Sequence, residues 1–358
     1  MENNLRSSLS FGALFISVPL FISCNIGLAQ MPGFAQFPIA IGSLPNGITS
    51  GPDGNLWFTE SISNRIAKIT TSGLVSEFPI PTANSGLGSI TQGPDGNLWF
   101  VEYAGNKLGK ITTAGVVTEY QLPTAMSYPI RIALGPDNNL WFTENLTNRV
   151  GRITTSGVIN EFAIPTPGGT PLGITAGPDG NLWFTESAAN KIGRITTSGS
   201  VVEFSLSNGS TPAEITSGPD GNLWFTEANG NRIGRITTGG ALTEFSLPSL
   251  AASPEGITSA PDGNLWFTEG ARDSIARITI TGVISEFALP TPNNLLGPIV
   301  VGPDRNLWVT SSLNYIFRAT IASPPLPTPA PSSLLLAATA LAALAGWYCW
   351  RVLRQHSA

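Results

Sequence analysis

Four polar side chains interrupt a repeated segment of this sequence and are the first candidates for chemistry. The repeat contains Gly-Ile-Thr or a close copy of it, and Arg131, Glu214 and Glu255 stand at or just before that tripeptide. Asn46 holds the same place in the first copy, where the remaining copies have small or apolar residues. Two carboxylates and one guanidinium in a concave polar site would bind a small polar ligand or a cation. The alternative is a set of solvated charges at loop ends, without a ligand.

The other acidic residues recur with the repeat and are therefore assigned mostly to the fold. A turn aspartate recurs at Asp53, Asp95, Asp137, Asp179, Asp220, Asp262 and Asp304. A glutamate after Trp-Phe-Thr or its copy recurs at Glu60, Glu102, Glu144, Glu186, Glu227 and Glu269. A third position holds Glu77, Glu119, Glu161, Glu203, Glu244 and Glu286. Only Glu2, Glu214, Glu255 and Asp273 fall outside these three sets.

The three acidic sets have different predicted roles. The turn aspartates are expected to hydrogen-bond their own backbone, and the Glu77 set is expected to pair across strands with Lys68 and its copies. For the Glu60 set two alternatives stay open: a ring of carboxylates at one mouth of a central channel, or pairing with the arginine or lysine that follows each glutamate. A ring would make Glu227 and Glu269 candidate metal ligands.

The elements that must position these residues are short strands in a regular repeat. Seven tryptophans, spaced 41 or 42 residues apart, mark the repeat at Trp57, Trp99, Trp141, Trp183, Trp224, Trp266 and Trp308. In the first unit, four segments rich in β-branched and aromatic residues cover 47–50, 55–60, 65–70 and 74–78. Asp-Gly and Ser-Gly turn signals separate strands, and no segment has helical periodicity. The sequence therefore predicts an all-β chain folded as a seven-bladed β-propeller.

The ends of the array predict how the ring closes. The seventh repeat stops near Ile321, before any fourth strand. The missing segment stands ahead of the first repeat, where 36–39 reads Gln-Phe-Pro-Ile and copies the Glu-Phe-Pro-Ile of 77–80. We expect this N-terminal segment to form the outer strand of blade seven, which leaves no open blade edge at the closure.

Composition and the two ends of the chain indicate an exported protein. The 358 residues carry a net charge of −5 and only 11% charged residues, which excludes a basic surface for nucleic acid. Residues 1–29 resemble a signal peptide, so the propeller is expected to span 30–322. A Pro-rich linker at 323–333 precedes an apolar span at 334–350 and a basic end at 351–358 that is expected to be cytoplasmic.

Two interpretations of the C-terminal segment stay open. It resembles the sorting tails read by exosortase-type systems of Gram-negative bacteria, and it also fits a plain membrane anchor of minimal length. Either interpretation places the propeller in the periplasm or at the cell surface, anchored by the helix or released after sorting.

The repeat itself, Gly-Ile-Thr-x-Gly-Pro-Asp-Gly-Asn-Leu-Trp-Phe-Thr-Glu followed by Asn-Arg/Lys-Ile-Gly-Arg-Ile, resembles that of the virginiamycin B (streptogramin) lyases from Gln36 to about Ile321. The resemblance implies a seven-bladed propeller that opens a cyclic ester by elimination with magnesium. It also implies histidines just before Gly-Ile-Thr in two adjacent blades, a Glu-x-His pair, and a metal-holding glutamate in the Trp-Phe-x-Glu segment.

This sequence departs from that family pattern at the catalytic positions. Its one histidine, His356, lies in the tail behind the apolar span. The residues before the Gly-Ile-Thr copies include no base other than the carboxylate of Glu255, and Ser311 replaces the glutamate of the last blade. A general base must lie within hydrogen-bond reach of the proton that it removes, so streptogramin lyase activity is not expected.

Two hypotheses of different classes follow. The first is a surface-anchored, non-catalytic propeller that binds a small polar ligand or an envelope component and needs no cofactor. The second is a divergent lyase or a lactonase-like enzyme that acts on a cyclic ester at one channel mouth, using Glu255 with Glu227 or Glu269 and Mg²⁺. Membership of a propeller family does not decide between them, because propellers carry unrelated functions.

Overall fold

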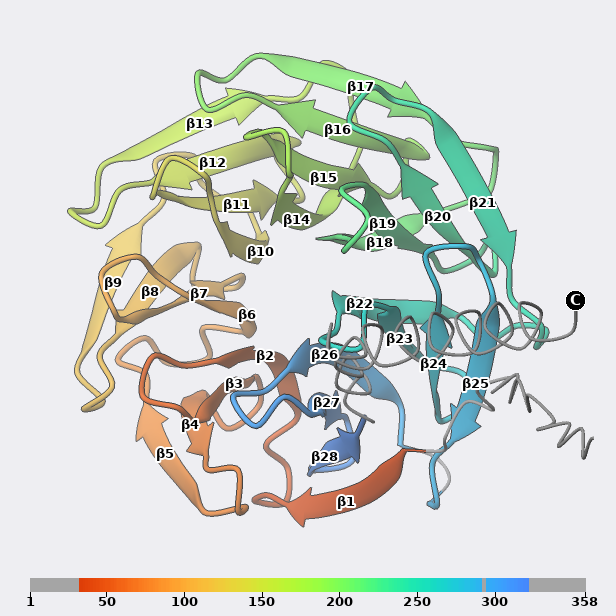
Figure 1. The fold of residues 1–358 in the computed structure, drawn as a ribbon. Helices are drawn as coiled ribbons and strands as arrows, with labels where there is room; N and C mark the ends of the chain where they lie inside the picture. The colour runs from red at the N-terminus through yellow and green to blue at the C-terminus, as the bar shows by residue number, and fades with distance from the viewer. Residues whose placement is uncertain (1–31, 292–293, 322–358) are drawn as a thin grey trace, which may run out of the picture. The chain divides into compact units, whose positions relative to one another are not determined.

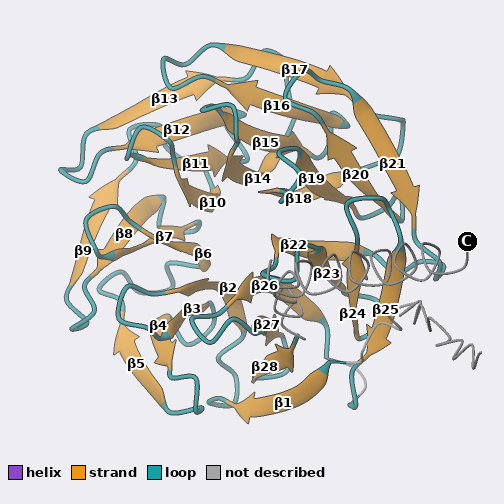
Figure 2. Ribbon diagram, in the orientation of Figure 1, coloured by secondary structure: helices purple, strands orange, loops and turns teal. Residues whose placement is uncertain are grey.

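Seven four-stranded antiparallel sheets make up the part of the chain that the computed structural model describes, residues 32–291 and 294–321. The sheets follow one another around a central channel, and the first strand of each lies nearest to it (Figure 1). Strands joined by loops account for all of this described part, with no helix (Figure 2). The predicted all-β, seven-bladed β-propeller is confirmed.

Blades one to four each use four consecutive strands, numbered outward from the channel. Blade one contains β2 (Pro45–Ser50), β3 (Leu56–Glu60), β4 (Arg65–Ile69) and β5 (Val75–Pro79). Blade two contains β6 (Leu87–Gln92), β7 (Leu98–Glu102), β8 (Lys107–Ile111) and β9 (Val117–Gln121). Blade three contains β10 (Pro129–Leu134), β11 (Leu140–Glu144), β12 (Arg149–Ile153) and β13 (Ile159–Ala163). Blade four contains β14 (Pro171–Ala176), β15 (Leu182–Glu186), β16 (Lys191–Ile195) and β17 (Val201–Ser205).

Blades five and six have the same plan, and blade seven differs in its outer strand. Blade five contains β18 (Pro212–Ser217), β19 (Leu223–Glu227), β20 (Arg232–Ile236) and β21 (Leu242–Ser246). Blade six contains β22 (Pro254–Ser259), β23 (Leu265–Glu269), β24 (Ser274–Ile278) and β25 (Ile284–Ala288). Blade seven contains β26 (Leu296–Val301), β27 (Leu307–Ser311), β28 (Tyr315–Thr320) and β1 (Gly33–Pro38).

The ring closes through the N-terminal strand, as the sequence predicts. Strand β1 pairs antiparallel with β28 in an uninterrupted register. Phe37 of β1 stacks on Trp308 with ring centroids 5.3 Å apart. On its other side Phe37 packs against Gly73 of blade one, where φ is +98° and a Cβ would come within 2.4 Å of the ring. The same side chain therefore completes blade seven and contacts blade one.

The hydrophobic core is divided among the interfaces between neighbouring blades. Trp57 and Ile66 of blade one, for example, pack against Ile90, Leu98 and Phe100 of blade two. Each blade thus buries one face on each neighbour. The flanking residues 1–31 and 322–358, with the predicted signal peptide, linker and membrane segment, lie outside the described residues.

Each repeated tryptophan is also held by polar groups. The indole Nε1 of Trp57 donates a hydrogen bond of 2.9 Å to Asp53 Oδ1. The ring stacks on Phe78 with centroids 5.5 Å apart, and the Lys68 ammonium lies 5.2 Å from the indole centroid and 5.9 Å from that of Phe78. Asp53 also accepts a hydrogen bond from the backbone of Asn55, as predicted for a turn aspartate. The turn aspartates therefore fix the tryptophans as well as the turns.

The predicted pairing of Glu77 with Lys68 is wrong. Lys68 lies opposite Ser76 and Glu77 opposite Ala67, so the two charged side chains point to opposite faces of the sheet. Glu77 instead pairs with Arg65, which shares its face, while Lys68 lies 3.5 Å from Asp53. The same arrangement recurs in blade two, where Lys107 pairs with Glu119 at 2.8 Å. The predicted register differs from the observed one by one residue, and a shift of one residue moves a side chain to the other face of the sheet, so the predicted partners are exchanged.

Closure through Phe37 gives a test of the fold. Phe37→Ala removes the ring that joins blades seven and one and should lower the free energy of unfolding by about 3 kcal/mol, as for large-to-small changes in cores. Denaturant unfolding of the variant measures this loss. Gln36→Ala on the same strand is the matched control, because that side chain is exposed and should change stability by less than about 0.5 kcal/mol. Equal stabilities for the two variants would contradict the closure.

Candidate functional site

The candidate residues lie on β-bulges at one end of the channel. In each blade the first and second strands change register, so that two residues of the first strand face one residue of the second. In blade three the bulge lies between Pro129 and Ile132, and it contains Arg131. The bulges of blades five and six contain Glu214 and Glu255, and that of blade one contains Asn46. Bulges re-aim side chains out of the regular pleat, here toward the channel.

A threonine of the second strand fixes most of these bulges. Thr226 Oγ1 accepts a hydrogen bond of 3.1 Å from the Glu214 backbone N–H and donates one of 2.8 Å to the Glu255 carbonyl oxygen in the next blade. Thr143 does the same between the Arg131 N–H, at 3.3 Å, and the Leu172 carbonyl oxygen, at 2.8 Å. One hydroxyl thus sets the position of two adjacent bulges.

Arg131 and Glu214 form an ion pair between blades three and five, through Arg131 Nε and Glu214 Oε1. The sequence predicted both at this mouth, but it did not predict their direct contact. Arg131 lines a mouth cavity of about 400 Å³ together with Asn46 and Glu255. It also lines the adjoining channel, of about 340 Å³, whose wall includes Thr49, Thr175 and Thr258. The ion pair therefore lies where the mouth cavity meets the channel.

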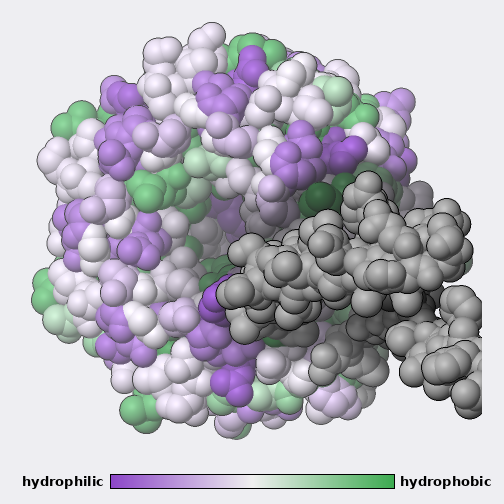
Figure 3. Space-filling model, in the orientation of Figure 1, coloured by the Kyte–Doolittle hydropathy of each residue, from purple (hydrophilic) through white to green (hydrophobic). Residues whose placement is uncertain are grey.

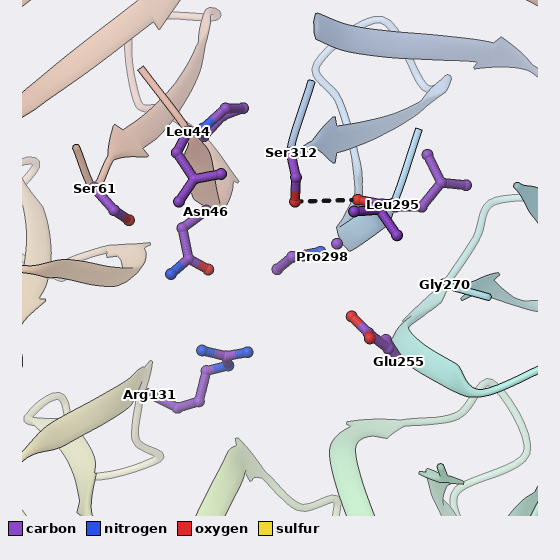
Figure 4. Close-up of a pocket in the computed structure, with 12 residues that line it drawn as sticks. Leu44, Asn46, Ser61, Arg131, Glu255, Gly270, Leu295, Pro298 and Ser312 are labelled. Atoms are coloured by element: carbon purple, nitrogen blue, oxygen red, sulfur yellow. Dashed lines mark hydrogen bonds between the residues drawn. The ribbon is translucent and has the colours of Figure 1, made fainter. Parts of the chain in front are cut away.

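The mouth cavity has one acidic and one basic side. Figure 4 shows the Glu255 carboxylate directed into the space from blade six and the Arg131 guanidinium, with Asn46 beside it, facing it from the other side. Leu44, Leu295 and Pro298 add apolar surface to the lining of this cavity. The space-filling view shows a hollow at the centre of the ring (Figure 3). Three of the four predicted residues line this cavity, and Glu214 lines the adjoining channel, where it is paired with Arg131.

Glu255 is the group in the cavity with the most unusual surroundings. Its side chain is exposed to the cavity, and no hydrogen bond or ion pair joins its carboxylate to any residue in the described ranges. Enclosure by the cavity walls raises the pKa of the Glu255 carboxyl. The positive charge of Arg131 lowers this pKa, and the negative charge of Glu214 raises it. Gly270 of the same blade makes room for the carboxylate, because a Cβ there would lie 3.0 Å from Glu255 Oε1.

The sequence reasoning missed Gly270 and the apolar wall of the cavity. A signal for Gly270 was present, since the residue after the Trp-Phe-Thr-Glu segment is Ser61, Tyr103, Asn145, Ser187, Ala228, Gly270 and Ser312 in the successive repeats. Gly270 is the one glycine at that position, in the repeat that has Glu255 at the bulge. The apolar wall had no such signal, because Leu44 and Leu295 come from loops whose path only the fold defines.

The six glutamates that end the second strands do not form an exposed ring. All six are fully buried within their blades. The alternative of pairing with the following cation holds for Glu227, which lies 2.8 Å from Arg232. In blades one to four the cation turns toward the outer-strand glutamate instead, and in blade six Ser274 stands in its place. Both carboxylate oxygens lack a hydrogen-bond partner in Glu102, Glu186 and Glu269. Burial and the nearby outer-strand glutamates raise the pKa of Glu102 to about 7 and those of Glu186 and Glu269 to about 8.

The mouth does not fit the magnesium ion that the family resemblance implies. Glu227 and Glu269 are enclosed in their blades, and neither lines the cavity that Glu255 faces. Glu214 is already paired with a guanidinium. No group of three or more acidic, histidine or cysteine side chains in the described part of the chain is arranged to hold a metal ion. Mg²⁺ requires near-octahedral oxygen ligands, and a neighbouring arginine opposes its binding.

Fold and site together define a seven-bladed β-propeller with a ligand-sized cavity at a channel mouth. The chain belongs to the virginiamycin B lyase family, whose sequence model matches residues 24–211 and 207–332. Among curated proteins, no relative matches the chain.

Solved structures agree with the family assignment. The chain is 39% identical to selenomethionine-substituted virginiamycin B lyase from Staphylococcus aureus, over 81% of this chain and 100% of that one, with a TM-score of 0.78. A streptogramin B lyase structure is also 39% identical, over 82% and 98%, with a TM-score of 0.79. A catalytically inactive histidine-to-alanine variant of the Staphylococcus aureus enzyme with quinupristin is 38% identical, over 81% and 100%, with a TM-score of 0.78.

More distant structures share the fold alone. Hydrazine synthase of Kuenenia stuttgartiensis is 15% identical over 80% of this chain, with a TM-score of 0.65. Over the described ranges, the structure contains no helix long and apolar enough to cross a membrane.

The buried glutamates predict an unusual dependence of stability on pH. The folded-state pKa of Glu269, about 8, lies above the ordinary value of 4.5, so its stabilising contribution is lost as pH rises toward and through 8. Glu269→Gln mimics the protonated acid beside Glu286. It should leave stability unchanged near about pH 5 and raise the free energy of unfolding by about 1 kcal/mol near about pH 9.

Chemical denaturation at both pH values measures the effect. Glu77→Gln is the control, because Glu77 is partly exposed and paired with an exposed arginine. Glu77→Gln should leave the difference between the free energies of unfolding at the two pH values as it is in the wild type. If the free energy of unfolding changes equally between the two pH values in the wild type and in Glu269→Gln, then Glu269 is ionised without cost in the folded protein.

Proposed function

We propose that this chain is a non-catalytic, ligand-binding member of its family, exported and held at the cell surface by its C-terminal segment. Its ligand is a small polar molecule, or the polar group of an envelope component, bound in the mouth cavity. The observation that carries the proposal is a ligand-sized cavity of about 400 Å³ in which Arg131 and Glu255 are the charged side chains among the described residues that line it. Cavities of this size suit small-molecule ligands.

Catalysis of the family reaction is disfavoured by the residues present. The Staphylococcus aureus relative is catalytically inactive once a histidine is replaced by alanine. In this chain the one histidine, His356, belongs to the C-terminal tail. Elimination from an ester needs a base at the substrate and a group that stabilises the developing charge. Glu255 is one carboxylate without a partner to orient it, and the mouth does not fit Mg²⁺.

Binding is favoured by rigidity and by unused hydrogen-bond capacity. The bulges are held by Thr143 and Thr226, so the side chains that line the cavity start from fixed backbone positions. Arg131 uses Nε for Glu214, which leaves donors of its guanidinium facing the cavity. A site of this kind selects a ligand without requiring a chemical step.

One observation favours the second candidate, a divergent enzyme acting on a cyclic ester. The Glu255 carboxyl has a raised pKa and faces a cavity, as a general base would. In a metal-dependent version of this enzyme, Glu255 would act with Mg²⁺ and with Glu227 or Glu269. The position of Arg131 and the enclosure of both glutamates argue against that arrangement.

An assay of the purified full chain separates the two candidates. We expect no ring opening of a streptogramin B antibiotic with Mg²⁺ present, measured by chromatography, beside the Staphylococcus aureus enzyme as a positive control. We also expect no change in melting temperature with Mg²⁺ or Ca²⁺ at concentrations on the order of millimolar. Turnover, or tight metal binding that Glu255→Gln abolishes, would establish the enzyme instead.

Export and anchoring are proposed from the ends of the chain. The support is the apolar stretch from Phe11 to Ile22 and the order of Pro-rich linker, apolar span and trailing arginines after Ser323. Cell fractionation should recover the full chain with the envelope, and deletion of 334–358 should release it from the membrane fraction. Recovery of both forms in the cytoplasm would contradict the proposal.

A further inference from the structure

We infer that the ligand of the mouth cavity carries an organic ammonium group, which binds Glu255, and an apolar body, which lies against Leu295 and Pro298. The inference rests on the proposed binding function and names the class of ligand. It follows from three features of the cavity: an unpartnered carboxylate, a neutralised arginine and an apolar wall.

The first feature is the charge that the cavity leaves uncompensated. Arg131 is neutralised by its ion pair with Glu214, so the three charged groups at this mouth sum to one negative charge, at Glu255. Within the described ranges, no donor reaches the Glu255 carboxylate. A carboxylate in an enclosed site binds a cation with hydrogen-bond donors more strongly than a neutral or anionic group.

The second feature is that blade six is shaped around this carboxylate. Glu255 occupies a bulge position where the equivalent residues of blades two, four and seven are Gly88, Leu172 and Gly297. Gly270, the neighbour of Glu269, leaves the space that the carboxylate occupies. Glu255 is the one carboxylate among the residues just before the Gly-Ile-Thr copies, Gly270 is the one glycine at its own position, and the two coincide in blade six.

The third feature excludes a bare metal ion as the best ligand. Leu44, Leu295 and Leu296 line the cavity with Pro45 and Pro298, and the Leu295 side chain is 59% exposed. A hydrated metal ion gains nothing from such a wall, whereas a hydrocarbon body gains about 25 cal/mol for each Å² that it buries. The volume of about 400 Å³ also far exceeds that of one ion.

An anionic ligand is disfavoured on the same grounds. Arg131 is already neutralised by Glu214, so an anion at its remaining guanidinium donors would gain little from the net charge and would face Glu255 across the cavity. An ammonium group is attracted by Glu255 and leaves the existing ion pair intact.

The experiment compares three probes of nearly equal shape and different charge with the full chain. The probes are phenethylamine, 2-phenylethanol and 3-phenylpropionate. Saturation-transfer NMR detects their binding, and titration at neutral pH measures their affinities. Ligands of this size bind with dissociation constants on the order of 1 mM. We expect the amine to bind at least about tenfold more tightly than the alcohol, and the acid to bind more weakly than either.

Two variants test the assigned residues. Glu255→Gln should lower the affinity for phenethylamine about tenfold and leave that for 2-phenylethanol unchanged. Gly270→Ala keeps every charge but crowds Glu255 Oε1, so it should weaken the amine selectively and to a smaller extent. Glu77→Gln, a carboxylate on the outer strand of blade one, is the matched control and should change nothing.

The pH dependence is a further readout. Because the pKa of Glu255 is raised by enclosure and by Glu214, against Arg131, affinity for the amine should be lost as pH falls through a value above the ordinary 4.5. Binding of 2-phenylethanol should not follow that change.

The outcomes separate this inference from the proposed function. If the alcohol or the acid binds as tightly as the amine, or Glu255→Gln has no effect, the ammonium inference is wrong and the binding function stands. If none of the probes binds, and a wider library of polar molecules also gives no binding at the mouth, both are wrong.

Discussion

The hydroxyl of a second-strand threonine, which bridges two blades in five of the seven positions around the ring, is the interaction on which the site most depends. It accepts a hydrogen bond from the bulge of its own blade and donates one to the bulge of the next, as Thr185 does between Gly173 and Ala213. A buried backbone N–H and a buried carbonyl would otherwise each lack a partner. The chain of contacts is interrupted at Val101, and at Thr310, whose hydroxyl has no partner. The intact stretch runs from blade three to blade six and carries Arg131, Glu214 and Glu255.

Charge is distributed in this propeller according to distance from the channel. Outer-strand glutamates such as Glu119 pair with a cation of their own blade and also accept hydrogen bonds from the preceding blade, here from Thr82. Second-strand glutamates such as Glu186 are fully buried and largely unpaired, which favours their protonated form. At the mouth, the charged side chains stand at positions where the residue departs from the repeat, namely Arg131, Glu214 and Glu255. The repeated acids therefore serve blade assembly, and the exceptional ones are available to a ligand.

Much of this arrangement could be predicted from the sequence, because a strict period fixes which positions are equivalent. The seven blades, the closure by β1 and the placement of the four mouth residues at one end all follow from counting along the repeat. The pairing of Glu77 could not be predicted in the same way, since the face of a strand changes with every residue and the register depends on the turn. The burial of Glu269 was also beyond the sequence, because a strand end exposes its side chain or covers it according to the neighbouring blade.

The sequence by itself thus determined the repeat, the number of blades and the four residues that depart from the repeat. It also determined that no histidine stands at the bulge positions. Only the tertiary structure decided that Arg131 is neutralised by Glu214, that Gly270 makes room for Glu255, and that Leu44 and Leu295 close one side of the cavity. The physical reason is that the Arg131–Glu214 pair and the two leucines bring different blades together, at distances set by the closure of the ring. Glu255 and Gly270 meet within blade six through the bulge between β22 and β23, and no local pattern of residues specifies either arrangement.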